Sequence, residues 1–150
     1  AKELSESGAT DYAICGMGGE LIARIIDDAD WLKSKDKHLV LQPMSAVDDL
    51  RLYLARNGFK IHTEKLVKDG GRLYIIFSVY YDGEPFEPAE DYLYVGGITA
   101  NDEFGLEYLT KNYKRIVKHA DMLLNSDKYS ERKSLLEIAQ KILDRMECNE

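Results

Sequence analysis

The chain has 150 residues and a formal net charge of −7, which suits one globular domain with a small appendage. The acidic balance argues against a general nucleic-acid-binding protein, although a single local basic patch is compatible with it. The sequence shows neither an apolar run long enough for a membrane span nor the apolar core of a signal peptide, so we expect a soluble, cytoplasmic protein with no membrane partner.

The cysteines and histidines predict no metal site. Cys15 falls in a predicted buried strand and Cys148 in the C-terminal tail, so we expect no disulfide between them. There is no CxxC pair, and His38, His62 and His119 are scattered along the chain.

The first predicted elements are a strand, a glycine turn and a helix. Residues 12–15 form an apolar run too short for a helix, residues 16–19 read Gly-Met-Gly-Gly, and apolar residues recur at helical spacing from Glu20 to about Asp30. This order is typical of a βα unit in an open α/β sheet, where ligands bind at the carboxyl ends of the strands. The glycine turn is therefore a candidate edge of an active site. A structural role in a tight connection is an equal alternative, because the spacing matches no standard phosphate-binding motif.

A second unit of the same kind follows. Residues 38–42 predict a strand that Pro43 stops, and Ser45 with Asp48 has the spacing of a capping box at the start of a helix. Asn57-Gly58 then predicts the end of that helix.

The pattern next changes to two strands joined by a hairpin. Residues 59–67 and 73–81 have strand character, and Lys68-Asp69-Gly70-Gly71 between them is a strong hairpin turn. Rossmann-like methyltransferases close their parallel sheet in this way, with the last strand inserted antiparallel beside the parallel ones. The sequence thus predicts an α/β fold, although fold alone does not give function.

Two long helices are predicted after a loop at residues 82–88. Thr99 and Asp102 have capping-box spacing before the first helix, and Ser130 is placed to cap the second. Both helices carry apolar residues at alternating steps of three and four, which predicts that they pack antiparallel across residues 125–128 as a coiled-coil hairpin. These residues are Leu106, Leu109, Tyr113, Ile116, Ala120 and Leu123 in the first helix, and Leu135, Ala139, Ile142 and Met146 in the second. We interpret both stripes as core.

Several of these motifs together resemble the bacterial tRNA (adenine(22)-N1)-methyltransferases. The matching residues are Cys15-Gly16-Met17-Gly18-Gly19 with Leu21-Ile22, Leu39-Val40-Leu41-Gln42-Pro43 with Leu50-Arg51, Asn57-Gly58-Phe59, and Glu64 with Gly71 and Tyr74. The resemblance spans most of the chain. It implies a partial Rossmann-like class I methyltransferase sheet ending in an antiparallel hairpin (residues 1–88), followed by a helical coiled-coil hairpin (residues 89–150).

The resemblance also implies that the chain is the C-terminal half of such an enzyme. Nothing in the sequence corresponds to the family's first half, which holds the methionine moiety and the ribose of the cofactor. Residues 2–7 would then be the end of a connection from a missing strand. The strand at residues 12–15 would be left at an edge, so we expect self-association through it.

The activity implied by the resemblance is the S-adenosylmethionine-dependent methylation of N1 of adenine 22 in tRNA. Gly16, Met17, Gly18, Gly19, Gln42 and Pro43 would form the substrate and methyl pocket, with Cys15, Gly16 and Met17 next to the cofactor. No general base is assigned, because N1 already offers a lone pair. Gln42 either contacts the adenine edge or satisfies backbone groups at the strand end. Met17 either packs on a flipped base or fills the edge of the sheet.

A basic stripe on the first long helix is a candidate tRNA contact. Lys111, Lys114, Arg115 and Lys118 lie almost opposite the apolar stripe at 100° per residue. A solvated helix face is the alternative interpretation. A function of another class also stays open, in which the whole chain is a non-catalytic α/β and coiled-coil module for protein interaction.

Overall fold

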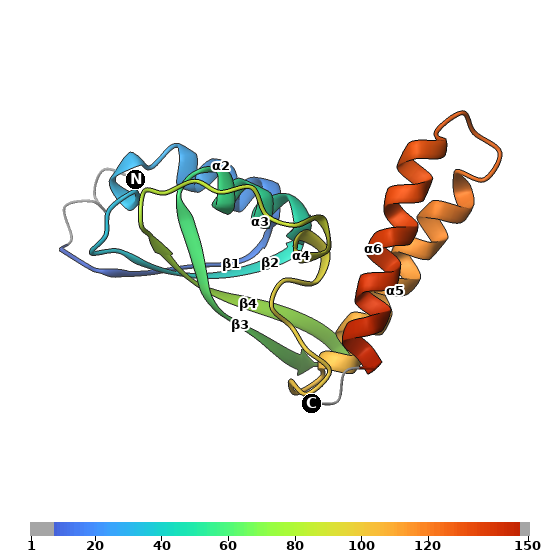
Figure 1. Cartoon of the computed structure of the whole chain (residues 1–150). Helices are drawn as coiled ribbons and strands as arrows, with labels where there is room; N and C mark the ends of the chain where they lie inside the picture. Colours follow the sequence, from blue (N-terminus) through green and yellow to red (C-terminus); the bar gives the residue numbers. More distant parts are fainter. Residues whose placement is uncertain (1–7, 148–150) are drawn as a thin grey trace. The chain divides into compact units, whose positions relative to one another are not determined.

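The computed structural model describes residues 8–147, which belong to two compact units, Ala1–Pro88 and Ala89–Glu150 (Figure 1). Each unit is described by itself below. The predictions for Cys148 and for residues 2–7 fall outside the described residues.

The first unit is built on a four-stranded mixed sheet with the order β1-β2-β4-β3. Strands β1 (Asp11–Gly18) and β2 (His38–Ser45) pair in parallel. Strand β4 (Arg72–Tyr81) pairs antiparallel with β2 on one side and with β3 (Phe59–Asp69) on the other. The prediction that the last strand is inserted antiparallel beside the parallel strands is confirmed.

Helices α2 (Gly19–Asp27) and α3 (Val47–Arg56) lie on the same face of this sheet (Figure 1). The core lies between these helices and the sheet, because side chains of a strand alternate between its two faces. It contains Ile22, Ile26, Leu39, Leu41, Leu50, Leu54, Phe77 and Val79, all buried. Helix α3 ends before Asn57-Gly58, as predicted, and Gly70-Gly71 joins β3 to β4.

Several predicted boundaries are wrong. Helix α2 ends at Asp27 rather than near Asp30, and a short 3-10 turn, η1 (Asp30–Leu32), follows it. Pro43 does not stop β2, which continues to Ser45. Strand β4 pairs with β2 only from His38 to Leu41, so at Pro43 the strand needs hydrogen bonds on one side alone and tolerates the missing N–H.

Ser45 and Asp48 do not form the predicted capping box. Ser45 pairs with Gly18 in the sheet, and the residue that precedes helix α3 is Ala46, which has a left-handed φ of 49° and makes no side-chain cap hydrogen bond. The strand extends into the residues that the capping box would need.

The prediction that β1 is a buried strand is also wrong. Cys15 is exposed, and every residue of β1 is exposed or half-buried. The reason is its position, because within residues 8–147 β1 forms the outer edge of the sheet and has a partner strand on one side only.

A buried ion pair ties helix α3 to strand β3. Arg51 is 1% exposed, and its Nε donates a hydrogen bond of 3.0 Å to Oε1 of Glu64. The guanidinium also lies 5.1 Å from the centre of the Phe77 ring on β4. Arg51 and Glu64 both belong to the motifs that carry the family resemblance, and the structure places them in the core of the first unit.

The second unit contains α4 (Glu90–Val95), α5 (Gly105–Met122) and α6 (Tyr129–Glu147). Helices α5 and α6 lie side by side (Figure 1) and run antiparallel, since Thr110 approaches Met146 and His119 approaches Glu131. Helix α4, which the sequence did not predict, is fastened to α6 by Arg145. This side chain donates to Oδ2 of Asp91 and to the carbonyl oxygen of Gly96, each at 2.7 Å.

The extra helix explains why the predicted stripe on α5 is partly wrong. Leu106 is 53% exposed, whereas Tyr108 and Asn112 are buried. The hydroxyl of Tyr108 donates to the carbonyl oxygen of Tyr94 in α4, at 3.3 Å. The buried face of α5 therefore packs against both α4 and α6, and not against α6 alone.

The predicted caps of the long helices are displaced as well. Asp102 accepts hydrogen bonds from the backbone N–H and the hydroxyl of Thr99, as a capping pair would, but α5 begins only at Gly105. Ser130 lies inside α6 rather than before it.

Removal of one partner of the buried ion pair should destabilise the first unit strongly. We expect Glu64→Ala to lower the free energy of unfolding by about 3–5 kcal/mol, because it leaves the Arg51 charge buried without its partner. Urea denaturation followed by circular dichroism measures this change. The combined variant Arg51→Met/Glu64→Leu should cost far less than the two single substitutions together.

The matched control is the exposed pair of Arg56 and Glu87, whose atoms approach to 2.7 Å at the surface. Glu87→Gln should leave the unfolding curve nearly unchanged, because exposed pairs contribute little. Equal losses at Glu64 and Glu87 would contradict the structural role of the buried pair.

Candidate functional site

The carboxyl ends of β1 and β2 bring the predicted site residues together. Cys15 pairs with Gln42, Met17 with Pro43, and Gly18 with Ser45. The residues between Cys15 and Gly19 thus lie beside Gln42 and Pro43 at the edge of the sheet that is formed by the carboxyl ends of the parallel strands. This edge is where ligands of open α/β sheets bind, and we call it the glycine edge.

The predicted glycine turn is in fact a bulged strand end followed directly by a helix. The pairing register of β1 shifts between Cys15 and Met17, and Gly16 has a φ of +77°. Its N–H donates a hydrogen bond of 2.9 Å to Oε1 of Gln42. A bulge of this kind bends the strand and changes the direction of the next side chain.

Gly19 is required by a close approach of two backbone segments. A Cβ atom on Gly19 would lie 2.1 Å from the carbonyl oxygen of Ala46, which is far inside van der Waals contact. The turn after β1 and the turn after β2 therefore pack directly on one another. This contact sets the position of the N-terminus of α2 at the glycine edge.

Met17 and Met44 expose sulfur-containing side chains at the glycine edge, with 37% and 49% of their surface accessible. Pro43, by contrast, is buried, so its ring does not face a ligand at the surface. The Nε2 of Gln42 lies 3.2 Å from Sδ of Met44 and 3.4 Å from the carbonyl oxygen of Pro43. Met44 was not predicted as a site residue. Only the observed continuation of β2 past Pro43 places Met44 at this edge.

A depression of about 250 Å³ lies beside this edge. It is lined by Gly18, Glu20, Leu21, Arg24, Ser45 and Ala46. Leu21 is 42% exposed there, although it belonged to the apolar stripe of the predicted helix. Glu20 and Arg24 give the depression one charge of each sign, and neither was predicted to take part in a site.

The amino ends of the same strands hold a different polar network. His38 lies with Nδ1 2.9 Å from Oδ1 of Asp11 and with Nε2 2.8 Å from Oγ of Ser78. The ring also stacks on Tyr80, with 4.5 Å between ring centres. The hydrogen bond from His38, with a smaller one from Thr10, holds the pKa of the Asp11 carboxyl below its usual value. The network joins β1, β2 and β4 at the end of the sheet away from the glycine edge.

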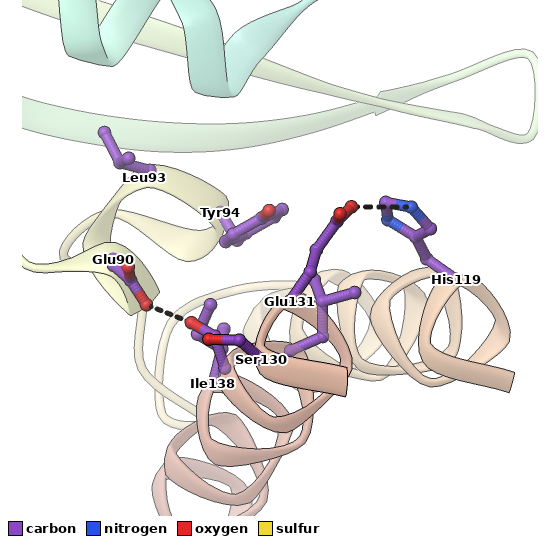
Figure 2. A pocket seen from close by; sticks show the side chains of 9 residues that line it. Glu90, Leu93, Tyr94, His119, Ser130, Glu131 and Ile138 are labelled. Atoms are coloured by element: carbon purple, nitrogen blue, oxygen red, sulfur yellow. Dashed lines mark hydrogen bonds and ion pairs between the residues drawn. The ribbon is translucent and has the colours of Figure 1, made fainter. Parts of the chain in front are cut away.

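The second unit contains a groove of about 570 Å³ between α4, α5 and α6 (Figure 2). Its walls are Glu90, Leu93, Tyr94, His119, Ser130, Glu131, Ser134, Leu135 and Ile138. The polar groups of the groove bind one another, since Ser134 donates to Glu90 at 2.7 Å and His119 lies 3.8 Å from Glu131. Glu131 also pairs with Lys128 at 3.1 Å. We therefore regard the groove as part of the packing of α4 on the hairpin.

The four residues of the predicted basic stripe are all exposed on α5. Arg115 additionally places its guanidinium 5.3 Å from the centre of the Tyr94 ring, so it also helps to hold α4. Lys111, Lys114 and Lys118 extend from the side of the helix that is not packed in the core.

Within residues 8–147, no group of three or more His, Cys, Asp or Glu side chains is arranged to hold a metal ion. None of the helices in this part of the chain combines the length and apolar character that a membrane crossing requires.

The architecture defines a class of protein. Two parallel strands lead through βα turns into helices on one face, and an antiparallel last strand is inserted next to them, which is the mixed sheet of a Rossmann-like methyltransferase fold. The family model described as tRNA (adenine(22)-N(1))-methyltransferase matches residues 3–147. The chain belongs to this family.

Known relatives support this assignment. The tRNA (adenine(22)-N(1))-methyltransferase of Bacillus subtilis is 25% identical over 160 residues, covering 95% of this chain and 66% of that protein. A Streptococcus agalactiae protein of the NADB-Rossmann superfamily has a crystal structure with a TM-score of 0.71 and 29% identity, covering 91% of this chain and 60% of its own.

A structure of M. capricolum TrmK in complex with the cofactor product S-adenosyl-homocysteine is similar in fold. Its TM-score is 0.67 at 19% identity, and the match covers 91% of this chain and 61% of that one. This chain therefore spans less than two thirds of the length of each of these three relatives.

Proposed function

We propose that this chain forms the substrate-side and C-terminal part of an S-adenosylmethionine-dependent enzyme that methylates N1 of adenine 22 in tRNA. Membership of the family over residues 3–147 carries the proposal. The glycine edge supports it, because Gly16, Met17, Gly18, Gly19, Gln42 and Pro43 converge where two parallel strands end. A tRNA substrate would place the protein in the cytoplasm.

The glycine edge fits one side of the cofactor rather than all of it. The neighbouring depression of about 250 Å³ is smaller than the roughly 300–1,000 Å³ of typical ligand pockets. Cys15, Gly16 and Met17 are exposed and add no positive charge that would repel the sulfonium end of the cofactor. When bound, S-adenosylmethionine supplies the methyl group. We infer that its remaining contacts come from a part of the enzyme outside this sequence.

The residues of this chain would act by positioning the adenine. N1 of adenine has a lone pair and does not need a strong general base, so correct placement can supply much of the catalysis. We propose that the exposed thioether of Met17 packs on the flipped base, while the backbone of Gly16–Gly19 allows the ring to approach closely. Gln42 would border the same pocket from β2, whereas the ring of Pro43 is buried and would not touch the base.

The cofactor assignment predicts weak binding by this chain alone. In calorimetric titration with S-adenosylmethionine, we expect dissociation constants well above the micromolar range, because the chain provides only one side of the site. Micromolar binding would show that the cofactor site is wrongly placed.

Joined to the cofactor-binding half that the family resemblance implies, the protein should transfer labelled methyl groups to tRNA with adenine 22. Equal transfer to a transcript with guanine at position 22 would contradict the proposed target.

The edge position of β1 supports the further proposal of self-association. One side of β1 has no partner strand within the described sheet, and such an edge can pair with another chain. We expect this chain to show dimers or larger species in size-exclusion chromatography with light scattering. Cys15→Lys at this edge should reduce them, because a lysine on an edge strand opposes strand pairing. A clean monomer at high concentration would contradict the proposal.

We propose that the α5–α6 hairpin is a coiled coil that presents the basic stripe to tRNA. The stripe consists of Lys111, Lys114, Arg115 and Lys118, and its exposure supports contact with phosphates. Phosphate contacts orient a nucleic acid without reading its sequence, so recognition of adenine 22 would be left to the glycine edge.

Replacement of the four stripe residues with Gln should weaken tRNA binding by the complete enzyme. Each lost phosphate contact should also flatten the log–log salt dependence of affinity by somewhat under one unit, since fewer counterions are released. Filter binding across salt concentrations measures both effects. A matched control replaces Lys128 and Lys133, which pair with Glu131 and Glu137 on α6. An unchanged slope in the stripe variant, with helix content retained, would identify the stripe as a solvated face.

A further inference from the structure

We propose that Gln42 is a positioning residue that holds the bulge at Gly16, and through it the direction of Met17, rather than a group that reads the adenine edge. This inference rests on the proposed methyltransferase function for its consequence in catalysis. Its structural part stands on the contacts of Gln42 alone.

The bulge leaves Gly16 without a cross-strand partner. Cys15 is paired with Gln42 and Met17 with Pro43, which are consecutive residues, so Gly16 is the extra residue of β1. Gly16 is exposed, so its N–H could bond to water, yet it donates to a side chain of the neighbouring strand. The side chain of Gln42 supplies the missing acceptor, because its Oε1 lies 2.9 Å from the Gly16 nitrogen.

The other end of the same amide is engaged as well. Nε2 of Gln42 lies near Sδ of Met44 and the carbonyl oxygen of Pro43, both of which accept hydrogen bonds. The opposite orientation of the amide would put an NH2 group against the N–H of Gly16. The amide is thus oriented by this chain and directed at the strand ends rather than at a ligand.

The hydrogen bond matters because the bulge determines where Met17 points. Gly16 has a φ of +77°, and a Cβ there would meet nothing within 4 Å, so glycine is needed for backbone conformation and not for space. The register shifts at Gly16 and returns after Met17, so loss of the bulge would shift the pairing of Met17 by one residue. A shift of one residue moves a side chain to the other face of the sheet. Met17 would then leave the pocket edge at which it is exposed.

The first test uses this chain labelled with 15N and with 13C in the methionine methyl groups. Gln42→Leu removes the acceptor, whereas Gln42→Glu keeps an acceptor oxygen and removes the donor. We expect amide exchange at Gly16 to accelerate by about tenfold or more and the Met17 methyl signal to move in Gln42→Leu, with both restored towards wild type in Gln42→Glu. Gln140→Leu on α6 is the control. Unchanged Gly16 exchange in Gln42→Leu would overturn the inference.

The second test measures methylation kinetics in the chain joined to the cofactor-binding half. Gln42→Leu should lower kcat by about tenfold or more and leave KM for tRNA within about twofold, and Gln42→Glu should recover most of kcat. A raised KM in both variants with kcat retained would overturn the inference, since it would mean that the amide contacts the tRNA. If the wild-type protein transfers no methyl group, the proposed function fails, and the amide-exchange experiment still decides the role of Gln42.

Discussion

The contact between Gly19 and Ala46 is the constraint on which the glycine edge depends. With no Cβ on Gly19, the start of α2 approaches the carbonyl oxygen of Ala46 more closely than any other residue type would allow. Ala46 meets it in a left-handed conformation, with a φ of 49°, which is costly for a residue with a side chain. The two consecutive βα turns thus pack against each other, and β1 and β2 end side by side. The pairing of Gly18 with Ser45 follows from this arrangement.

Local sequence patterns were sufficient for the order of the elements in the first unit. Alternating apolar residues, Asn57-Gly58 and Gly70-Gly71 each act through a few neighbouring residues, and the elements they predict are present. The ends of strands depend instead on what lies beside them. Strand β2 continues through Pro43 because its pairing with β4 ends at Leu41. Cys15 is exposed because β1 has one neighbouring strand in the described sheet. The local residues predict neither the end of β2 nor the exposure of β1, although the family resemblance led us to expect β1 at an edge.

The second unit shows the same limit in another form. The periodicity of α5 and α6 predicted two packed helices, yet α4 was missed because a helix of six residues has almost no periodic signal. Its position is set by Arg145, which reaches Asp91 across 54 positions of sequence. With α4 in place, Tyr108 of α5 is buried and donates to the carbonyl oxygen of Tyr94, while Leu106 is exposed. The sequence named residues that the structure brings together at the glycine edge, whereas the bulge and the hydrogen bond from Gly16 to Gln42 were not predicted.

The composition of the glycine edge agrees with catalysis by position. Its central residues are glycines, an amide, a proline and two methionines, and the charged Glu20 and Arg24 belong to the depression beside it. An edge of this kind offers backbone groups and polarisable side chains, which can place a flat aromatic ring but are poorly suited to removing a proton. A nitrogen with a free lone pair is the kind of acceptor that needs no such removal. For the proposed activity, the rigidity of the edge would be its main contribution, because a small displacement of the adenine would reduce the rate steeply. The buried Arg51–Glu64 pair, the Gly19–Ala46 contact and the Gln42 amide each add to that rigidity, from the core outward to the surface.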